Sequence, residues 1–366
     1  MRVKHVTKLV EGDILAKPIK DQFGRILLQK DVYLTERLIK LLKQYYFGNV
    51  YVVDIYAEGI VSEEPISDEL KYKAINQIRS TFNAFEHYIH GQQTKIILDE
   101  SIMHIEETVN EIASVIKTSD MMLSIMSDIF VFDQYLYTHS LNVTLYSLVL
   151  AKKLNYNEKD MTELGIGALL HDIGKLKIPK EILNKPGALT KFEYEVVKEH
   201  TTYGYQLLKD VQNIPDSIVS CAYEHHERLN GTGYPRGLKD QDIHEYAKIL
   251  MIADVFDAVT TDRSYRDAYL PHVGFEILYA GSGTEFNKSY IEAFRKSISL
   301  YPNGTYVRLS DGRAGIVAKQ NRFFTDRPVV RVTEEHGHRL ALNQVYEIDL
   351  SKHLNITISH KSSEYE

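Results

Sequence analysis

The chain has 366 residues, which is long enough for two or three domains, each with its own core. A formal net charge of -7 argues against a general nucleic-acid binder, because such proteins carry a basic face. The only cysteine is Cys221, so no internal disulfide can form, which suits a reducing compartment. The chain has no apolar run of roughly 18 residues and no apolar segment of a signal peptide. We therefore expect a cytoplasmic protein without a membrane span.

Residues 1–62 are expected to form a small α+β module with a regulatory or interaction role. Short apolar runs on both sides of Asp21 to Gly24 predict a hairpin, and Thr35 suits the cap of a following amphipathic helix. Val50 to Val53 is typical of a strand. No residue here is typical of a catalytic site, and the sequence does not identify the signal to which the module responds.

Residues 63–120 predict a helical linker with two heptad stripes of apolar side chains. The first stripe contains Ile75, Ile78, Phe82, Phe85 and Ile89, and the second contains Ile102, Ile105, Val109, Ile112 and Ile116. Each stripe covers only about two heptads, so two interpretations are open. Either the helices pack on each other or on the main domain, or they bury the seam of a homodimer.

Residues 121–300 are dense in helical patterns and predict a helical bundle, whereas residues 301–366 predict a small β module without catalytic residues. Five histidines and two aspartates of the bundle fall on or at the end of successive helices: His139, His171, Asp172, His200, His225, His226 and Asp254. They recur at intervals that suit one helix and its return loop. A bundle of antiparallel helices can therefore aim all seven side chains at one point.

These seven side chains have the chemistry of a transition-metal site. Asp172 and Asp254 bring negative charge that an apolar bundle does not tolerate without cations. Seven ligands are too many for one tetrahedral centre, but they suit two metals about 3.5–4 Å apart, with Asp172 as the bridge. Such a pair activates a bridging water for an in-line displacement at a phosphate. Lys175 follows His171 by four residues and can meet the charge that develops on that phosphate.

A second cluster suits a nucleotide. Tyr234, between Gly233 and Pro235, offers a ring on which a base can stack. Arg263 and Arg266 offer guanidinium groups for phosphates. Taken alone, the Gly-Tyr-Pro sequence is only a turn signal.

Together, several motifs in order resemble one family. They are His171-Asp-Ile-Gly-Lys175, Asn184-Lys-Pro-Gly-Ala-Leu-Thr190, His225-His-Glu227, Gly231-Thr-Gly-Tyr-Pro-Arg-Gly-Leu238 and Ile252-Ala-Asp-Val-Phe-Asp-Ala258. Over about residues 125–300 the chain resembles the HD-GYP family, the cyclic di-GMP phosphodiesterases within the HD metal-phosphohydrolase superfamily. The resemblance implies a mainly α fold: an all-helical HD-type bundle, here flanked by a small N-terminal α+β module and a small C-terminal β module. It also implies a site with two or three metal ions, usually iron or manganese.

Position by position, the seven candidate ligands match the metal ligands of the family. Lys175 matches the motif lysine near the scissile phosphate, so Asp172 and Lys175 are the expected catalytic residues. Tyr234, Arg263 and Arg266 fall where family members touch the dinucleotide.

The chain departs from the family pattern at two places. Asn230 stands where the family often has an aspartate, at a loop position that is no ligand. Three-metal members carry a glutamate one helical turn before the first histidine, and here that place holds Tyr135. A neutral phenol is a poor ligand at neutral pH, and Asp133 lies off the ligand face of the helix. We therefore expect two divalent ions, iron or manganese, and not three.

The expected function is hydrolysis of cyclic di-GMP to linear pGpG, and in some family members onward to GMP, through a metal-bridging hydroxide. Two alternatives stay open. The first is an HD phosphohydrolase of another cyclic dinucleotide. The second is a non-catalytic sensor or scaffold that binds a cyclic dinucleotide or a diguanylate cyclase partner. We also expect a homodimer, with a diguanylate cyclase domain as a candidate partner and no nucleic-acid polymer as ligand.

Overall fold

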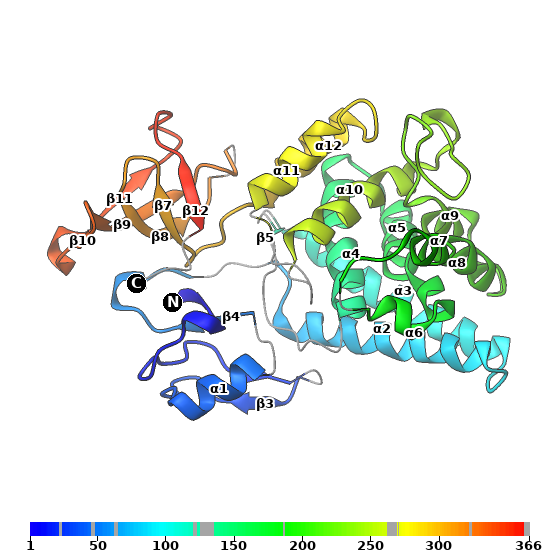
Figure 1. Ribbon diagram of the computed structural model, residues 1–366, viewed down its shortest axis with the longest axis horizontal. Coiled ribbons are helices and arrows are strands. Elements are labelled where there is room, and N and C mark those ends of the chain that lie inside the picture. Colours follow the sequence, from blue (N-terminus) through cyan, green and yellow to red (C-terminus); the bar gives the residue numbers. More distant parts are fainter. Residues whose placement is uncertain are drawn as a thin grey trace. The chain divides into compact units, whose positions relative to one another are not determined.

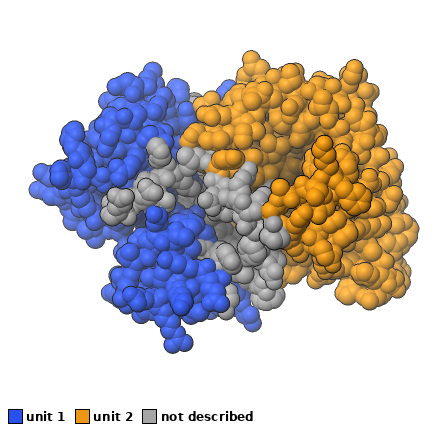
Figure 2. Space-filling model, in the orientation of Figure 1, with its two compact units in different colours: residues 1–64, 121–135, 296–366 blue, residues 65–120, 136–295 orange. Residues whose placement is uncertain are grey.

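The computed structural model describes residues 1–21, 24–44, 48–61, 65–119, 123–124, 135–185, 187–261, 269, 271–321 and 324–361 (Figure 1). The chain forms two compact units (Figure 2). Unit 1 comprises residues 1–64, 121–135 and 296–366, and unit 2 comprises residues 65–120 and 136–295. The N-terminal and C-terminal segments thus belong to one unit, while the boundaries of the four predicted domains stay a prediction.

The N-terminal part of unit 1 is a small α+β module, as its sequence predicted. Its elements are β1 (Arg2–His5), β2 (Ile19–Lys20), β3 (Ile26–Leu28), α1 (Glu36–Gln44) and β4 (Asn49–Val52). Strand β1 pairs with β4 and β2 pairs with β3, both in antiparallel fashion. Their core includes Leu15, Leu34, Ile39 and Val50, all of them buried. Val50 of β4 and Ile39 of α1 supply part of this core, and Leu15 and Leu34 come from the segments between the elements.

The C-terminal part of unit 1 is an antiparallel sheet with the strand order β10-β9-β8-β7-β12, in which β11 also pairs with β9. The strands are β7 (Tyr306–Leu309), β8 (Ala314–Lys319), β9 (Val329–Glu335), β10 (His338–Arg339), β11 (Tyr346–Asp349) and β12 (Ile358–Lys361). Tyr56 and Ile60 of the N-terminal module pack against Tyr306 and Ile316 of this sheet. The Tyr56 hydroxyl donates a hydrogen bond to the Leu340 carbonyl at 2.8 Å. A short parallel pair, β5 (Leu123–Ser124) with β6 (Ile298–Ser299), completes the unit.

Unit 2 is helical and holds the predicted bundle (Figure 1). Its main helices are α4 (Tyr135–Lys153), α5 (Glu158–Leu170), α6 (Lys180–Leu183), α7 (Lys191–Lys198), α8 (His200–Lys209), α9 (Asp216–Glu224), α10 (Glu245–Thr260), α11 (Pro271–Ala280) and α12 (Lys288–Arg295). A 3-10 turn, η4 (Ile173–Lys177), follows α5 and packs on α8. Edge-to-face contacts among Tyr146, Phe256 and Phe294 fix α4, α10 and α12 around one core. The predicted mainly α fold is confirmed.

The two linker helices also belong to unit 2. Helices α2 (Asp68–Ile89) and α3 (Lys95–Thr118) lie side by side (Figure 1), and α3 packs on α5. Ile75, Ile78, Phe82 and Val109 are each 0% exposed within the single chain. The centre of each heptad stripe is therefore filled within one chain. This confirms the packing interpretation and leaves these four side chains no surface for a dimer seam.

No described helix is both long and apolar enough to cross a membrane.

Because the centre of the stripe is buried within one chain, a substitution there should change the stability of the protein and not its oligomeric state. Phe82→Ala should lower the free energy of unfolding by about 3–5 kcal/mol, because a fully buried ring is replaced by a cavity. Met103→Ala is the control, since this α3 side chain is 62% exposed and its loss should change the free energy by less than about 0.5 kcal/mol. Urea denaturation followed by circular dichroism measures both. Equal stabilities of the two variants would contradict the packing described here.

Candidate metal centre

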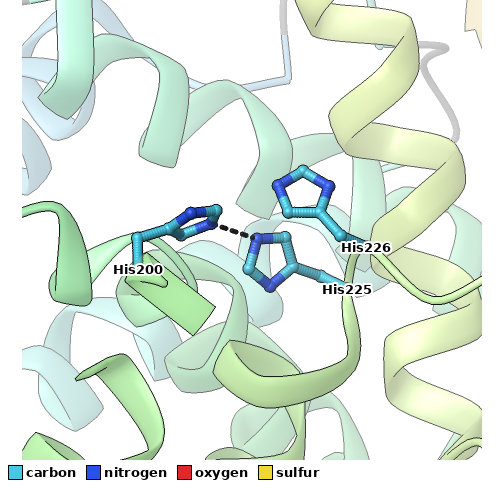
Figure 3. A group of neighbouring side chains, drawn as sticks. All are labelled: His200, His225 and His226. Carbon is cyan, nitrogen blue, oxygen red and sulfur yellow. Dashed lines mark hydrogen bonds between the residues drawn. The ribbon is translucent and has the colours of Figure 1, made fainter. Parts of the chain in front are cut away.

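One group of ligands comes from the start of α8 and the end of α9. His200 opens α8, and His225 and His226 follow α9 directly (Figure 3). The Nδ1–H group of His200 donates to the Val197 carbonyl at 2.6 Å, and that of His225 donates to the Cys221 carbonyl at 2.9 Å. Neither Nε2 atom then carries a proton on a neutral ring. These two Nε2 atoms face each other at 3.2 Å, so a cation between them would relieve two opposed lone pairs.

Asp172 lies at the centre of the remaining ligands. Its Oδ1 atom is 3.5 Å from Nε2 of His200 and 4.0 Å from Nε2 of His225. Its Oδ2 atom is 3.4 Å from Nε2 of His171 and 3.6 Å from Nε2 of His139. Each carboxylate oxygen thus faces its own pair of imidazoles. This is the geometry that a carboxylate bridge between two metals requires.

Asp254 of α10 closes the cluster on the side of His139. Its Oδ1 atom is 3.2 Å from Nε2 of His139, and its Oδ2 atom is 3.7 Å from Nδ1 of His226. Three groups of side chains each have ligand atoms within 4.8 Å of one another. They are His139 with His171 and Asp254, His171 with Asp172 and His225, and His200 with His225 and His226. All seven predicted ligands therefore come together, and these groups have the composition to hold metal ions.

Hydrogen bonds outside the cluster orient the imidazoles. His171 donates its Nδ1–H to the Ala168 carbonyl at 2.7 Å, and His139 donates its own to Oδ2 of Asp257 at 2.7 Å. Asn142 holds the other Asp257 oxygen through a 2.8 Å bond from Nδ2. Both rings therefore turn Nε2 toward the cluster, as histidine ligands in metal sites do. Asp257 lies one helical turn after Asp254 within the motif from Ile252 to Ala258, but its role as an acceptor was not predicted from the sequence.

The electrostatics of Asp172, His200 and His225 favour metal binding. Burial raises the pKa of Asp172, but Lys175 and His171 lower it to well below its usual value, so the group is a carboxylate. Burial lowers the pKa of His200 to about 4 and takes that of His225 well below its ordinary value. Both imidazoles are therefore neutral at pH 7, as metal ligands must be.

Two buried polar atoms of the cluster have no hydrogen-bond partner among the described residues. They are Oδ1 of Asp172 and Nε2 of His171. A buried carboxylate oxygen without a donor is costly. Divalent cations bind carboxylate oxygens and imidazole nitrogens, so these two orphaned atoms fit the predicted metal chemistry.

Tyr234 lies beside the cluster, as predicted. Its ring centroid is 4.7 Å from that of His226, with the planes inclined by 30°. The loop that carries it is held by Glu227, whose carboxylate accepts hydrogen bonds from the backbone N–H groups of Arg236 at 2.8 Å and Leu238 at 2.9 Å. Gly233 allows the loop to approach this anchor, because a Cβ there would lie 2.4 Å from the Glu227 Cα. Glu227 is 0% exposed, and its role in holding this loop was not predicted from the sequence.

Lys175 also lies at the cluster, where Nζ pairs with Oδ2 of Asp172 at 2.5 Å. Arg263 and Arg266 lie outside the described residues, as does Asp133. The side chain of Tyr135 is likewise not among those described. The roles assigned to these arginines, and the choice of two ions over three, therefore stay predictions.

Residues 124–289 match the HD domain family. This part of the chain is an HD domain. The resemblance seen in the motifs is thereby confirmed, and the match contains all seven histidines and aspartates of the cluster. A solved structure, the HDG"Y"P protein Bd1817 of Bdellovibrio bacteriovorus, shares the fold with a TM-score of 0.50 and 17% identity, over 80% of this chain and 97% of that one.

Curated relatives share more of the sequence. A cyclic di-GMP phosphodiesterase of Pseudomonas aeruginosa is 36% identical over 230 residues, which cover 63% of this chain and 55% of the relative. One of Thermotoga maritima is 38% identical over 165 residues, 45% of each chain. The 3'3'-cGAMP-specific phosphodiesterase 1 of Vibrio cholerae is 43% identical over 134 residues, 36% of this chain and 31% of the relative. The chain spans about half the length, or less, of these relatives.

The position of Asp257 predicts an effect on metal affinity. Asp257→Asn should weaken metal binding by roughly 10- to 100-fold, because the amide no longer fixes the His139 ring with a charged acceptor. Asp216→Asn is the matched control, since that carboxylate is 85% exposed. Calorimetric titration of metal-free protein with Mn²⁺ measures the affinity, and circular dichroism confirms folding. Equal affinities in a folded Asp257→Asn variant and the control would show that Asp257 has no orienting role.

Proposed function

We propose that this chain is a metal-dependent phosphodiesterase that hydrolyses cyclic di-GMP to linear pGpG. The observation that carries the proposal is Asp172, whose two oxygens face two separate pairs of histidines at 3.4–4.0 Å. The names of the Pseudomonas aeruginosa and Thermotoga maritima relatives support cyclic di-GMP as the substrate.

The seven ligands of the cluster are proposed to hold two divalent ions, iron or manganese. Imidazole nitrogens with carboxylate oxygens suit these metals, whereas Mg²⁺ and Ca²⁺ prefer oxygen ligands alone. When bound, a metal pair supplies an acidified water and a clamp on the oxygens of an in-line displacement. Asp172 and Asp254 would balance part of the metal charge. Asp257 would keep Nε2 of His139 turned toward the metal ions.

Lys175 is proposed to act on the scissile phosphate. Its side chain is 23% exposed while its Nζ atom reaches the buried Asp172 carboxylate, so it extends from the rim to the centre of the site. A lysine in this position can neutralise the charge that grows on the phosphate oxygens in the transition state. Tyr234 is proposed to stack on the substrate, with Arg263 and Arg266 as further contacts.

A second candidate substrate has an observation in its favour. The Vibrio cholerae relative named for 3'3'-cGAMP shares 43% identity over 134 residues, in the same range of similarity as the cyclic di-GMP relatives. A 3'3'-cyclic GMP-AMP differs from cyclic di-GMP in one base and carries the same two phosphodiester linkages. A homodimer and a diguanylate cyclase partner stay predictions that no described contact tests.

The proposed reaction depends on the bridging carboxylate. Protein purified without oxygen should linearise cyclic di-GMP, and Asp172→Ala should abolish this while the protein stays folded by circular dichroism. Chromatography of the products measures turnover, with 3'3'-cGAMP assayed beside cyclic di-GMP to compare the two substrates. Full turnover by a well-folded Asp172→Ala variant would refute the role of Asp172.

The ligand set predicts the number of metal ions. Elemental analysis of protein purified without oxygen should give two ions per chain, because the seven side chains with water suffice for two six-coordinate ions. Anomalous scattering from a crystal then locates them. Three fully occupied sites, with one ion bound to Tyr135 or Asp133, would contradict this prediction.

A further inference from the structure

Helix α7 contributes two side chains to the rim of the metal centre. Nζ of Lys198 lies over the Tyr234 ring at 5.5 Å and over the Tyr194 ring at 5.6 Å, each measured to the ring centroid. Tyr234 in turn lies against His226, a ligand of the cluster. A continuous row of groups therefore runs from the metal ligand through Tyr234 and Lys198 to Tyr194. Both α7 residues lie outside the motifs used above.

The burial of Lys198 distinguishes it from an ordinary surface lysine. Its side chain is only 26% exposed, whereas those of Lys159 on α5 and Lys180 on α6 are 83% and 78% exposed. Lys198 is held in place by an ion pair with Glu195 at 2.6 Å, one turn earlier on α7. Glu195 is itself 64% exposed, so water screens this pair and an arriving anion can compete for the ammonium group.

Tyr194 offers an open aromatic surface next to this cation. It is 49% exposed, although it lies on a helix whose start is fixed by a capping box between Thr190 and Glu193. Lys185 adds a salt bridge to Glu193 at 2.6 Å. The ring is therefore presented to solvent by a firmly anchored helix. Rigid, exposed aromatic rings beside a cation are the usual platform for a nucleobase.

We infer that Lys198 and Tyr194 form a second substrate subsite, in which Lys198 binds the phosphate that is not cleaved and Tyr194 stacks on a base of the cyclic dinucleotide. This inference rests on the proposed function. A cyclic dinucleotide carries two phosphates and two bases. The metal cluster and Lys175 account for one phosphate, and Tyr234 accounts for one ring contact. The row of groups on α7 supplies a cation and a ring at the adjoining edge.

The test compares a two-phosphate substrate with a one-phosphate substrate, using metal-loaded full-length protein. Lys198→Met, which keeps the aliphatic stem, should raise KM for cyclic di-GMP by roughly 10-fold, the value of one charged contact to a phosphate. For bis(p-nitrophenyl) phosphate, which occupies the metal cluster alone, KM should rise by no more than about twofold. Lys191→Met is the matched control, because this exposed lysine starts the same helix. Metal content should be unchanged in all variants.

Two further variants give effects that a purely structural role would not. Glu195→Gln releases Lys198 from its partner and should lower KM for cyclic di-GMP by roughly two- to fivefold. Tyr194→Ala should raise KM by roughly 10-fold, and Tyr194→Phe should restore it, because the ring and not the hydroxyl stacks.

The outcomes separate this inference from the proposed function. Wild-type protein that cleaves bis(p-nitrophenyl) phosphate but no cyclic dinucleotide overturns both. Wild-type turnover of cyclic di-GMP with an unchanged KM in Lys198→Met overturns the α7 subsite alone, and assigns the second phosphate to other groups such as Arg263 and Arg266. An equal loss with both substrates, or a loss of metal, would show that Lys198 acts through the neighbouring His200 and would overturn the subsite as well.

Discussion

The central constraint in this protein is the burial of the Asp172 carboxylate, which is 1% exposed in the interior of a helical domain. A buried carboxylate without compensating groups costs several kcal/mol. Here Lys175 and four imidazoles surround it, and its Oδ1 atom still has no hydrogen-bond donor among the described residues. These groups have the composition to hold metal ions, and helices α4, α5, α8, α9 and α10 or the residues next to them bring the seven candidate ligands to this one carboxylate.

Close packing of the backbone is the second requirement of that arrangement. Gly174 in the turn after Asp172 passes so near to α8 that a Cβ there would lie 1.9 Å from the His200 carbonyl oxygen and 2.4 Å from the Gly204 nitrogen. A larger residue would push α8 away and move His200 from the carboxylate. Glycine is therefore required at position 174 for steric reasons, whether or not a metal is bound.

Much of the site was predictable because helix spacing and ligand chemistry are both visible in a sequence. The residues that were not predicted hold other groups in position, and this role depends on the three-dimensional structure. Asp257 lies one turn after Asp254, and an aspartate at that spacing is as typical of a solvated helix face as of a buried acceptor. The Glu227 carboxylate accepts hydrogen bonds from backbone N–H groups of its own loop. Only the folded structure shows that these N–H groups point at the carboxylate. The heptad stripes were ambiguous for a similar reason, since a stripe of two heptads looks the same whether its partner is in the same chain or in a second one.

The linker helices pack against α4, the helix that carries one ligand of the candidate metal centre. Phe82 of α2, from the buried stripe, contacts the Tyr137 ring edge to face at 5.6 Å. Tyr137 lies two residues before His139, near the start of α4. The apolar surface that α2 and α3 bury therefore helps to fix the helix that carries His139, and burial of this kind is the main favourable term in folding. The same packing offsets part of the cost of holding Asp172, Asp254 and Asp257 away from water, so the cluster depends on the stripe.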